Sequence, residues 1–267
     1  MRNRFMALWL CSLVAVCFSA GCGGELNPQS RKMLMGCYAS YNRGDDSEAV
    51  RSCDEFLRDH SQGDRAAEAV LIRGLARYRQ GDESSAKKDT QKVLTSTNHP
   101  ALQANAMFIL AEVALSRDDD ELAESLYRDC LDIAPRDSDS AKQSHYRLGV
   151  LLQRLGQFLP ADIQFEHLRL RFPSSELSDR AEGLVGAKAW TLQVGMFETP
   201  VGADGRITAL AKLGIIARRQ AILYKKKLAY AVWVGRENRF ALAEVTLEKI
   251  KHLFPEAIIT VDRVMEK

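Results

Sequence analysis

The sequence predicts a two-domain chain: an all-α solenoid of four helix pairs, followed by a small α+β domain with the element order βαββαβ. Two observations lead to this fold class. A pattern of small and turn residues recurs four times between residues 31 and 175 with a period near 37, which is typical of stacked repeats. From about Lys188 this period stops, and alternating apolar and polar residues indicate strands instead.

Composition agrees with a globular chain. The 267 residues are 46% hydrophobic and 27% charged, which excludes a disordered or collagen-like protein. The single long apolar run lies near the N-terminus and is too short to span a membrane comfortably. A polytopic membrane protein is therefore excluded.

The first 22 residues form an export signal. Arg2 and Arg4 precede the apolar stretch 5–18, and the small residues 19–21 lead to Cys22. This resembles a bacterial lipoprotein signal, which implies removal of residues 1–21, acylation of Cys22 and a membrane anchor with 22–30 as a tether. No Asp follows Cys22, so we expect the outer membrane, with the protein facing the periplasm. The alternative is an ordinary secretory signal, cut near Ala20, that leaves a soluble exported protein.

Export permits disulfides. Three cysteines remain in the expected mature chain beyond Cys22, namely Cys37, Cys53 and Cys130. Cys37 and Cys53 fall on facing helices of the first repeat, where they could form a disulfide or remain as two buried thiols. Cys130 falls at a core position of the third repeat.

Each repeat is expected to fold as a helix, a tight turn and a second helix. Small residues let the two helices approach closely, and glycine or aspartate between them suits the turn. The small position holds Cys37, Gly74, Ala111 and Gly149; the turn holds Gly44, Gly81, Asp118 and Gly156; the second helix carries Ala49, Ala86, Ala123 and Ala161.

This pattern resembles the tetratricopeptide repeat (TPR), and the best copy is LGVLLQRLGQFLPADIQFEHLRLRFP at 148–173. The longer period and the ending R-F-P-S-S resemble periplasmic lipoproteins of the outer-membrane-assembly and Tol–Pal-associated families. The resemblance implies that residues 31–175 bind an envelope protein or peptide in a concave groove. Alternatively, these helices merely space the anchor from the C-terminal domain.

After an expected linker at 176–187, residues 188–267 alternate strands and helices. The expected strands are 189–195, 215–224, 228–234 and 257–261, and the expected helices are 199–213 and 239–253. This order corresponds to a split βαβ sheet with both helices on one face.

The half-motifs WTLQVGMF at 190–197 and YAVWVGR at 230–236 resemble the SPOR (sporulation-related repeat) domain of bacterial envelope proteins. The resemblance implies binding to peptidoglycan, with a preference for glycan strands stripped of their peptides, often at cell-division sites.

Strand parity selects the residues that would contact glycan on the face opposite the helices. Thr191 and Gln193 share that face with Trp233, whose indole suits stacking on a sugar. Arg218 and Gln220 on the second strand are weaker candidates. Packing in a core or burial by the linker is the alternative role of Trp233, and Trp190 points the other way and is expected in the core.

Charge differs between the two parts. Residues 23–187 carry 21 basic and 27 acidic side chains, net −6, whereas residues 188–267 carry 14 and 8, net +6. A basic domain favours encounter with an acidic polymer such as the cell wall. We exclude nucleic acid because the chain is exported and because the central strands lack the aromatic pair of RNA-binding sheets.

No pattern indicates catalysis, a metal or a cofactor. The histidines lack metal-ligand spacing, and no G-x-S-x-G, phosphate loop or dinucleotide fingerprint occurs. We therefore expect no enzyme, but a lipid-anchored envelope scaffold that binds glycan with its C-terminal domain and a protein with its TPR groove. The alternative is an outer-membrane protein-assembly factor that acts mainly through the repeats.

Overall fold

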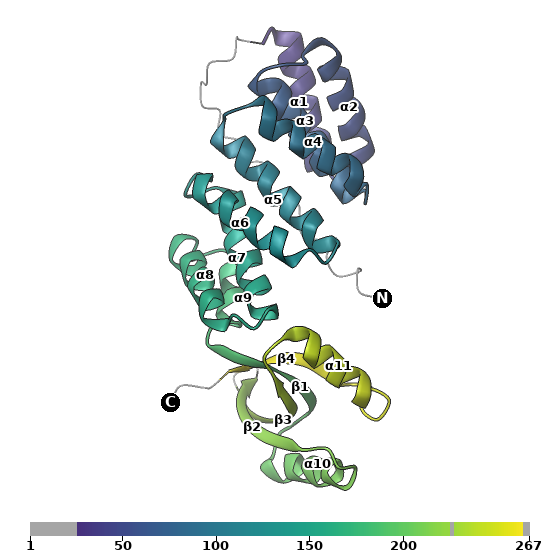
Figure 1. Cartoon of the computed structure of the whole chain (residues 1–267), viewed down its shortest axis with the longest axis vertical. Coiled ribbons are helices and arrows are strands. Elements are labelled where there is room, and N and C mark those ends of the chain that lie inside the picture. Colours follow the sequence, from purple (N-terminus) through teal and green to yellow (C-terminus); the bar gives the residue numbers. More distant parts are fainter. Residues whose placement is uncertain (1–25, 225–226, 264–267) are drawn as a thin grey trace. The chain divides into compact units, whose positions relative to one another are not determined.

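The computed structural model describes residues 26–224 and 227–263 (Figure 1). The chain divides into two compact units, residues 26–148 and 149–263, and the boundary falls inside helix α7. The signal and the first four residues of the expected tether, Cys22 among them, lie outside the described residues. No helix among residues 26–224 and 227–263 is both long and apolar enough to cross a membrane.

Four helix pairs follow one another, as the sequence predicts. The first helices of the pairs are α1 (Pro28–Asn42), α3 (Asp64–Arg79), α5 (Pro100–Ser116) and α7 (Asp139–Arg154). The second helices are α2 (Asp46–Asp59), α4 (Glu83–Ser96), α6 (Asp120–Ile133) and α8 (Phe158–Arg171). The chain is thus mostly helical and TPR-like, and the prediction of helix pairs is confirmed.

The turn between the helices of each pair uses the left-handed conformation. Its φ values are +81° at Gly44, +82° at Gly81, +58° at Asp118 and +84° at Gly156. In the first three pairs the next residue is an aspartate, whose carboxylate accepts a backbone N–H at the start of the second helix. In the fourth pair Gln157 takes this place and its side chain makes no such bond.

Small residues let the helices of a pair approach closely. The alanines Ala49, Ala86, Ala123 and Ala161 are fully buried. A Cβ on Gly74 would lie 3.2 Å from the Cβ of Asp89, and one on Gly149 would lie 2.5 Å from the ring of Phe165. Helix contact therefore explains the repeated small position, most strongly at Gly149.

The expected linker is largely folded. Helix α9 (Glu176–Glu182) occupies its first half, with Ser175 as the N-cap. The hydroxyl of Ser178 donates to the carbonyl oxygen of Phe172 at 2.6 Å, and the backbone N–H of Gly186 donates to Asp162 at 3.1 Å. Residues 176–187 thus differ from the expected linker, because local capping and these two bonds hold them against α8.

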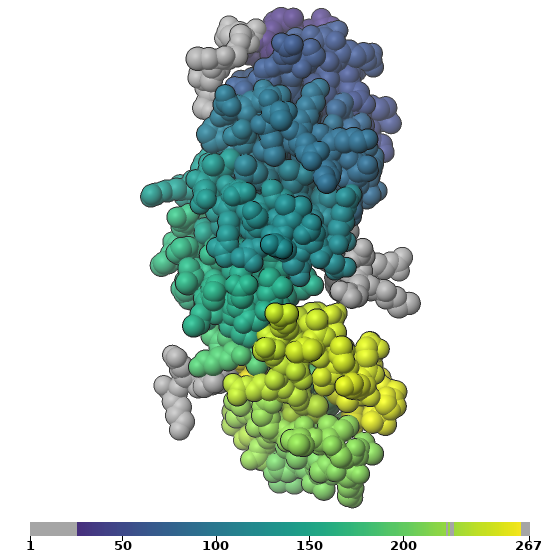
Figure 2. Space-filling model, in the orientation of Figure 1, coloured from purple at the N-terminus to yellow at the C-terminus, as the bar shows by residue number. Residues whose placement is uncertain are grey.

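The C-terminal elements have the predicted order βαββαβ: β1 (Ala187–Phe197), α10 (Pro200–Lys212), β2 (Ala217–Tyr224), β3 (Lys227–Glu237), α11 (Phe240–Ile250) and β4 (Ile258–Arg263). The strands form an antiparallel sheet in the order β2-β3-β1-β4. In Figure 2, α10 and α11 form much of the visible surface of this unit, in light green and yellow.

Both helices pack on one face of the sheet. Trp190, Leu192 and Val194 of β1 lie in one buried cluster with Leu210 of α10 and Ile250 of α11. The predicted parity of β1 and the core position of Trp190 are therefore confirmed. The opposite face carries the residues predicted to bind glycan.

Candidate functional site

The candidate sites are the polar side chains between the helix pairs of the first unit and the helix-free sheet face of the second. Between α1 and α3, the hydroxyl of Tyr38 donates to the carboxylate of Glu68 at 3.2 Å, and Arg65 lies 2.7 Å from the same group. Glu68 is 7% exposed. Burial raises the pKa of Glu68, although Arg65 and Tyr38 partly oppose this effect.

A second polar group links the third pair to the middle of α7. Glu112 of α5 accepts a hydrogen bond from the hydroxyl of Tyr127 and lies 3.2 Å from Arg147. Burial, together with the negative charge of Glu112, raises the pKa of Tyr127 well above its usual value. The phenol therefore stays protonated and remains a hydrogen-bond donor.

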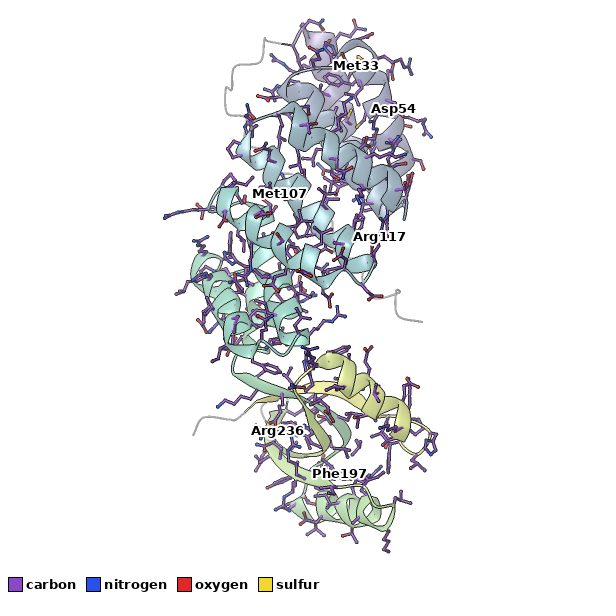
Figure 3. All side chains as sticks on the ribbon, in the orientation of Figure 1. Met33, Asp54, Met107, Arg117, Phe197 and Arg236 are labelled. Atoms are coloured by element: carbon purple, nitrogen blue, oxygen red, sulfur yellow. The ribbon has the colours of Figure 1, made fainter. Side chains whose placement is uncertain are left out.

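The third group joins α2, α3 and α4. The carboxylate of Asp89 forms ion pairs with Arg73 at 2.6 Å and with Arg77 at 2.7 Å. Arg73 also forms an ion pair with Asp54 at 2.5 Å. Figure 3 shows Asp54 on α2. Asp89 is only 5% exposed, so both arginines are needed to offset its burial. None of these three groups is predictable from the sequence alone, because no repeated spacing identifies their members.

The sheet face brings three of the five predicted glycan-binding residues into one row. Trp233 of β3 pairs in register with Gln193 of β1 on one side and with Arg218 of β2 on the other. Gln220 lies in the neighbouring row opposite Ala231. The prediction that these residues share one face therefore matches the observed register.

This face is less open than the sequence predicts. Trp233 is 5% exposed, the guanidinium of Arg218 lies over its ring at 5.3 Å, and its indole N–H has no partner among the described residues. Thr191 is fully buried, and its hydroxyl donates to the carbonyl oxygens of Val234 and Gly235. On this face the side chains of Gln193 and Gln220 are half-buried and therefore more exposed than the indole of Trp233.

An ion pair between the two edge strands holds Arg218 over the ring of Trp233. Arg218 of β2 contacts Asp262 of β4 at 2.8 Å, and Arg236 lies 3.3 Å from the same carboxylate. Figure 3 shows Arg236 on the strands of this unit. Edge strands three spacings apart in a flat sheet are separated by about 14 Å, so this ion pair spans the two central strands. Alternation along β4 places Asp262 on the same face.

The sheet shares its core with the last helix pair. The indole N–H of Trp190 donates to the carbonyl oxygen of Gln153 at 2.9 Å, and the Gln153 amide donates to the carbonyl oxygen of Leu184 at 2.8 Å. Phe240 stacks edge-on against Trp190, and Phe158 packs against the same cluster. Residues 149–171 of the last helix pair and the sheet therefore pack together within the second unit.

Metal chemistry finds no support in the described ranges. Within residues 26–224 and 227–263, no three His, Cys, Asp or Glu side chains come together in a group that could hold a metal ion. The acidic and basic groups above are already paired with one another. Their arrangement suits the packing of helices and strands.

Comparisons with known proteins give one family match. The outer membrane lipoprotein family YfiO matches residues 24–103, which is under a third of the chain. A comparison with curated proteins gives no significant match.

Several solved structures resemble the chain. A tetratricopeptide repeat protein from Parabacteroides merdae is 15% identical over 70% of this chain and 66% of its own, with a TM-score of 0.48. MamA is 18% identical over 56% of this chain and 80% of its own, with a TM-score of 0.45. YrrB, described as a TPR protein with an unusual peptide-binding site, is 17% identical over 58% of this chain and 73% of its own, with a TM-score of 0.44. This chain thus spans less than two thirds of the Parabacteroides protein. Such low identities carry no information on partners.

Proposed function

We propose that this chain is a lipid-anchored protein of the bacterial outer membrane whose helix pairs bind an envelope protein or peptide in the periplasm. The observation that carries the proposal is the match to an outer membrane lipoprotein family, which begins two residues after Cys22. The signal-like leader and the regular helix pairs support it independently. Non-enzymatic binding is the function that a repeat fold serves most directly.

The first helices of the pairs supply the surface for a partner. Helix α3 contacts both α1 and α5, so these three helices form one layer of the first unit. Asn105 of α5 follows Glu68 by 37 residues and occupies the same place in the repeat, where it is half-buried. A peptide lying across this layer would meet Asn105, whereas Asp54 of α2 belongs to the second helices.

A photo-cross-linking amino acid at Asn105 tests the partner proposal in cells that make the full chain with its leader. We expect one discrete cross-linked product from position 105 and none from the matched control position 54. Equal products from both positions, or from neither, would contradict binding by this layer.

Replacement of Cys22 by serine tests the anchor separately. We expect the Cys22→Ser chain to lose incorporation of a labelled fatty acid and to leave the membrane fraction. A variant that keeps the label would show that Cys22 is not the acylated residue.

The family match also favours a role in outer-membrane protein assembly, which was the alternative from sequence. Depletion of the protein would then lower the amount of folded β-barrel proteins in the outer membrane. The Gln193→Ala change on the sheet face would leave that amount unchanged, because this proposal places the activity in the repeats.

Peptidoglycan binding by a SPOR-like sheet is the second candidate. Its support is the single row formed by Gln193, Trp233 and Arg218. The test is co-sedimentation of the full mature chain with intact sacculi and with sacculi stripped of peptides by an amidase. Full-length protein is needed because Trp190 is bonded to Gln153. We expect stronger binding to stripped glycan and weaker binding by Gln193→Ala; sedimentation with neither preparation would exclude the candidate.

A further inference from the structure

Two cysteines of the first helix pair lie at matching core positions of helices that pack against each other. Cys37 of α1 and Cys53 of α2 are both fully buried in one apolar cluster. At the equivalent positions of the second repeat, a Cβ on Gly74 would lie 3.5 Å from the side chain of Thr90. The Cys37 thiol donates to the carbonyl oxygen of Met33 at 3.5 Å. Cys130 of α6 is equally buried, but its sulfur accepts a hydrogen bond from Ser144 at 3.2 Å and contacts no thiol among the described residues.

We propose that Cys37 and Cys53 are a covalent modification site, at which oxidation forms a disulfide that ties α1 to α2. Helix packing already holds the two side chains together, and the bond needs that proximity. The inference rests on the proposed export for its place in the cell, since an oxidising compartment supplies the oxidant. Cys130 would remain a free thiol.

The reaction is a thiol–disulfide exchange with an oxidant that is itself a disulfide, either an oxidised protein dithiol or glutathione disulfide. One of the two cysteines, as a thiolate, attacks one sulfur of the oxidant, forms a mixed disulfide and releases one thiolate. The other cysteine, after losing its proton, attacks the sulfur of the first and releases the second thiolate. Two protons and two electrons pass to the oxidant, which leaves as two thiols.

Burial makes the reaction slow. Neither sulfur is exposed, so the oxidant reaches either thiol only when α1 separates locally from α2 and α3, the two helices that it contacts. Once formed, the link closes the short stretch between residues 37 and 53 and restricts the unfolded chain. The oxidised protein should therefore unfold at a higher temperature than the reduced protein.

The test uses the purified mature chain from residue 23, reduced and then equilibrated with mixtures of reduced and oxidised glutathione. After denaturation, free thiols are alkylated and the protein is digested and weighed. We expect a mass lower by about 2 Da before alkylation, a linked peptide pair containing Cys37 and Cys53, and one alkylated thiol at Cys130. Alkylation of all three cysteines in every mixture, or a link to Cys130, would overturn the proposal.

Matched variants separate the link from changes in packing. Cys53→Ala should abolish both the linked peptide and the rise in Tm on oxidation, whereas Cys130→Ala should retain both. A rise in Tm that persists in Cys53→Ala would overturn the proposal. This assay is independent of export: a link formed in the purified chain but absent from protein recovered from cells would support the pair and count against export.

Discussion

Gly81 and Gly156 hold the same place in two repeats but meet different surroundings. Both adopt a left-handed conformation, with φ of +82° and +84°. A Cβ on Gly81 would meet nothing within 4 Å, whereas one on Gly156 would lie 2.4 Å from the carbonyl oxygen of Asn238, just before α11. The glycine at this repeat position thus permits only a turn in the first unit. In the second unit it permits both a turn and the close approach of the segment before α11.

The two regions also use different interactions. Helices α2, α3 and α4 are joined by Arg73, Arg77 and two aspartates. The last helix pair joins the sheet through the Trp190–Gln153 bond and aromatic packing. The repeats therefore share a backbone pattern, but the side chains that stabilise each one depend on the element packed against it.

Gly156→Ala gives the largest expected effect. The variant combines left-handed strain with a clash against backbone, so we expect a loss of about 3–5 kcal/mol in the free energy of unfolding. Gly81→Ala meets only the strain and should lose about 1–2 kcal/mol. Urea denaturation of the mature chain, followed by circular dichroism, measures both. Equal losses would remove the distinction between the two turns.

Asp89→Asn tests the charged contacts of the first unit. The change leaves two arginines without their buried partner and should lower the free energy of unfolding by about 3 kcal/mol. Asp54, which is 45% exposed and contacts Arg73 alone, provides the control, and Asp54→Asn should cost under about 1 kcal/mol. Equal losses in the two variants would show that the burial of Asp89 does not determine how much these ion pairs contribute to stability.

Two tryptophan substitutions sharpen the comparison within the second unit. Trp190→Phe removes the donor to the Gln153 carbonyl, whereas Trp233→Phe removes an indole N–H that has no partner. We expect the first variant to be less stable than the second by about 1–3 kcal/mol. Hydrogen exchange at residues 184–192 should rise only in Trp190→Phe. A similar rise in both variants would show that the hydrogen bond does not hold β1.

Glu68→Gln gives the smallest effect, seen in the dependence of stability on pH. Burial raises the folded-state pKa of Glu68 above its ordinary value of 4.5, so the folded protein holds this proton more tightly than the unfolded chain. The stability from this group is full below pH 4.5 and is lost as pH rises through the folded-state pKa. The Glu68→Gln variant should not lose this stability as pH rises. Urea denaturation of both proteins across this pH range measures the difference, and identical dependence of stability on pH would contradict the prediction.

The sequence was sufficient for most of the fold, because its signals are local. The turn residues Gly44, Gly81, Asp118 and Gly156 and the buried alanines mark each helix pair, and strand alternation marks β1 and β3. Helix α9 was missed because seven residues carry too little periodicity. The cover over Trp233 was not predicted because it depends on Asp262, which is 44 residues from Arg218 in sequence and meets it only across the two central strands of the folded sheet.

The hydrogen bond from Trp190 to Gln153 has a consequence for how such a chain can be rearranged in evolution. A recombination event that moved only the sheet to another protein would leave an indole N–H and a buried aromatic surface without their partners. The smallest segment that can be inherited as a unit therefore includes the last helix pair. Chains that gained this sheet by shuffling should carry a helix pair before it, with Gly at the position of Gly156.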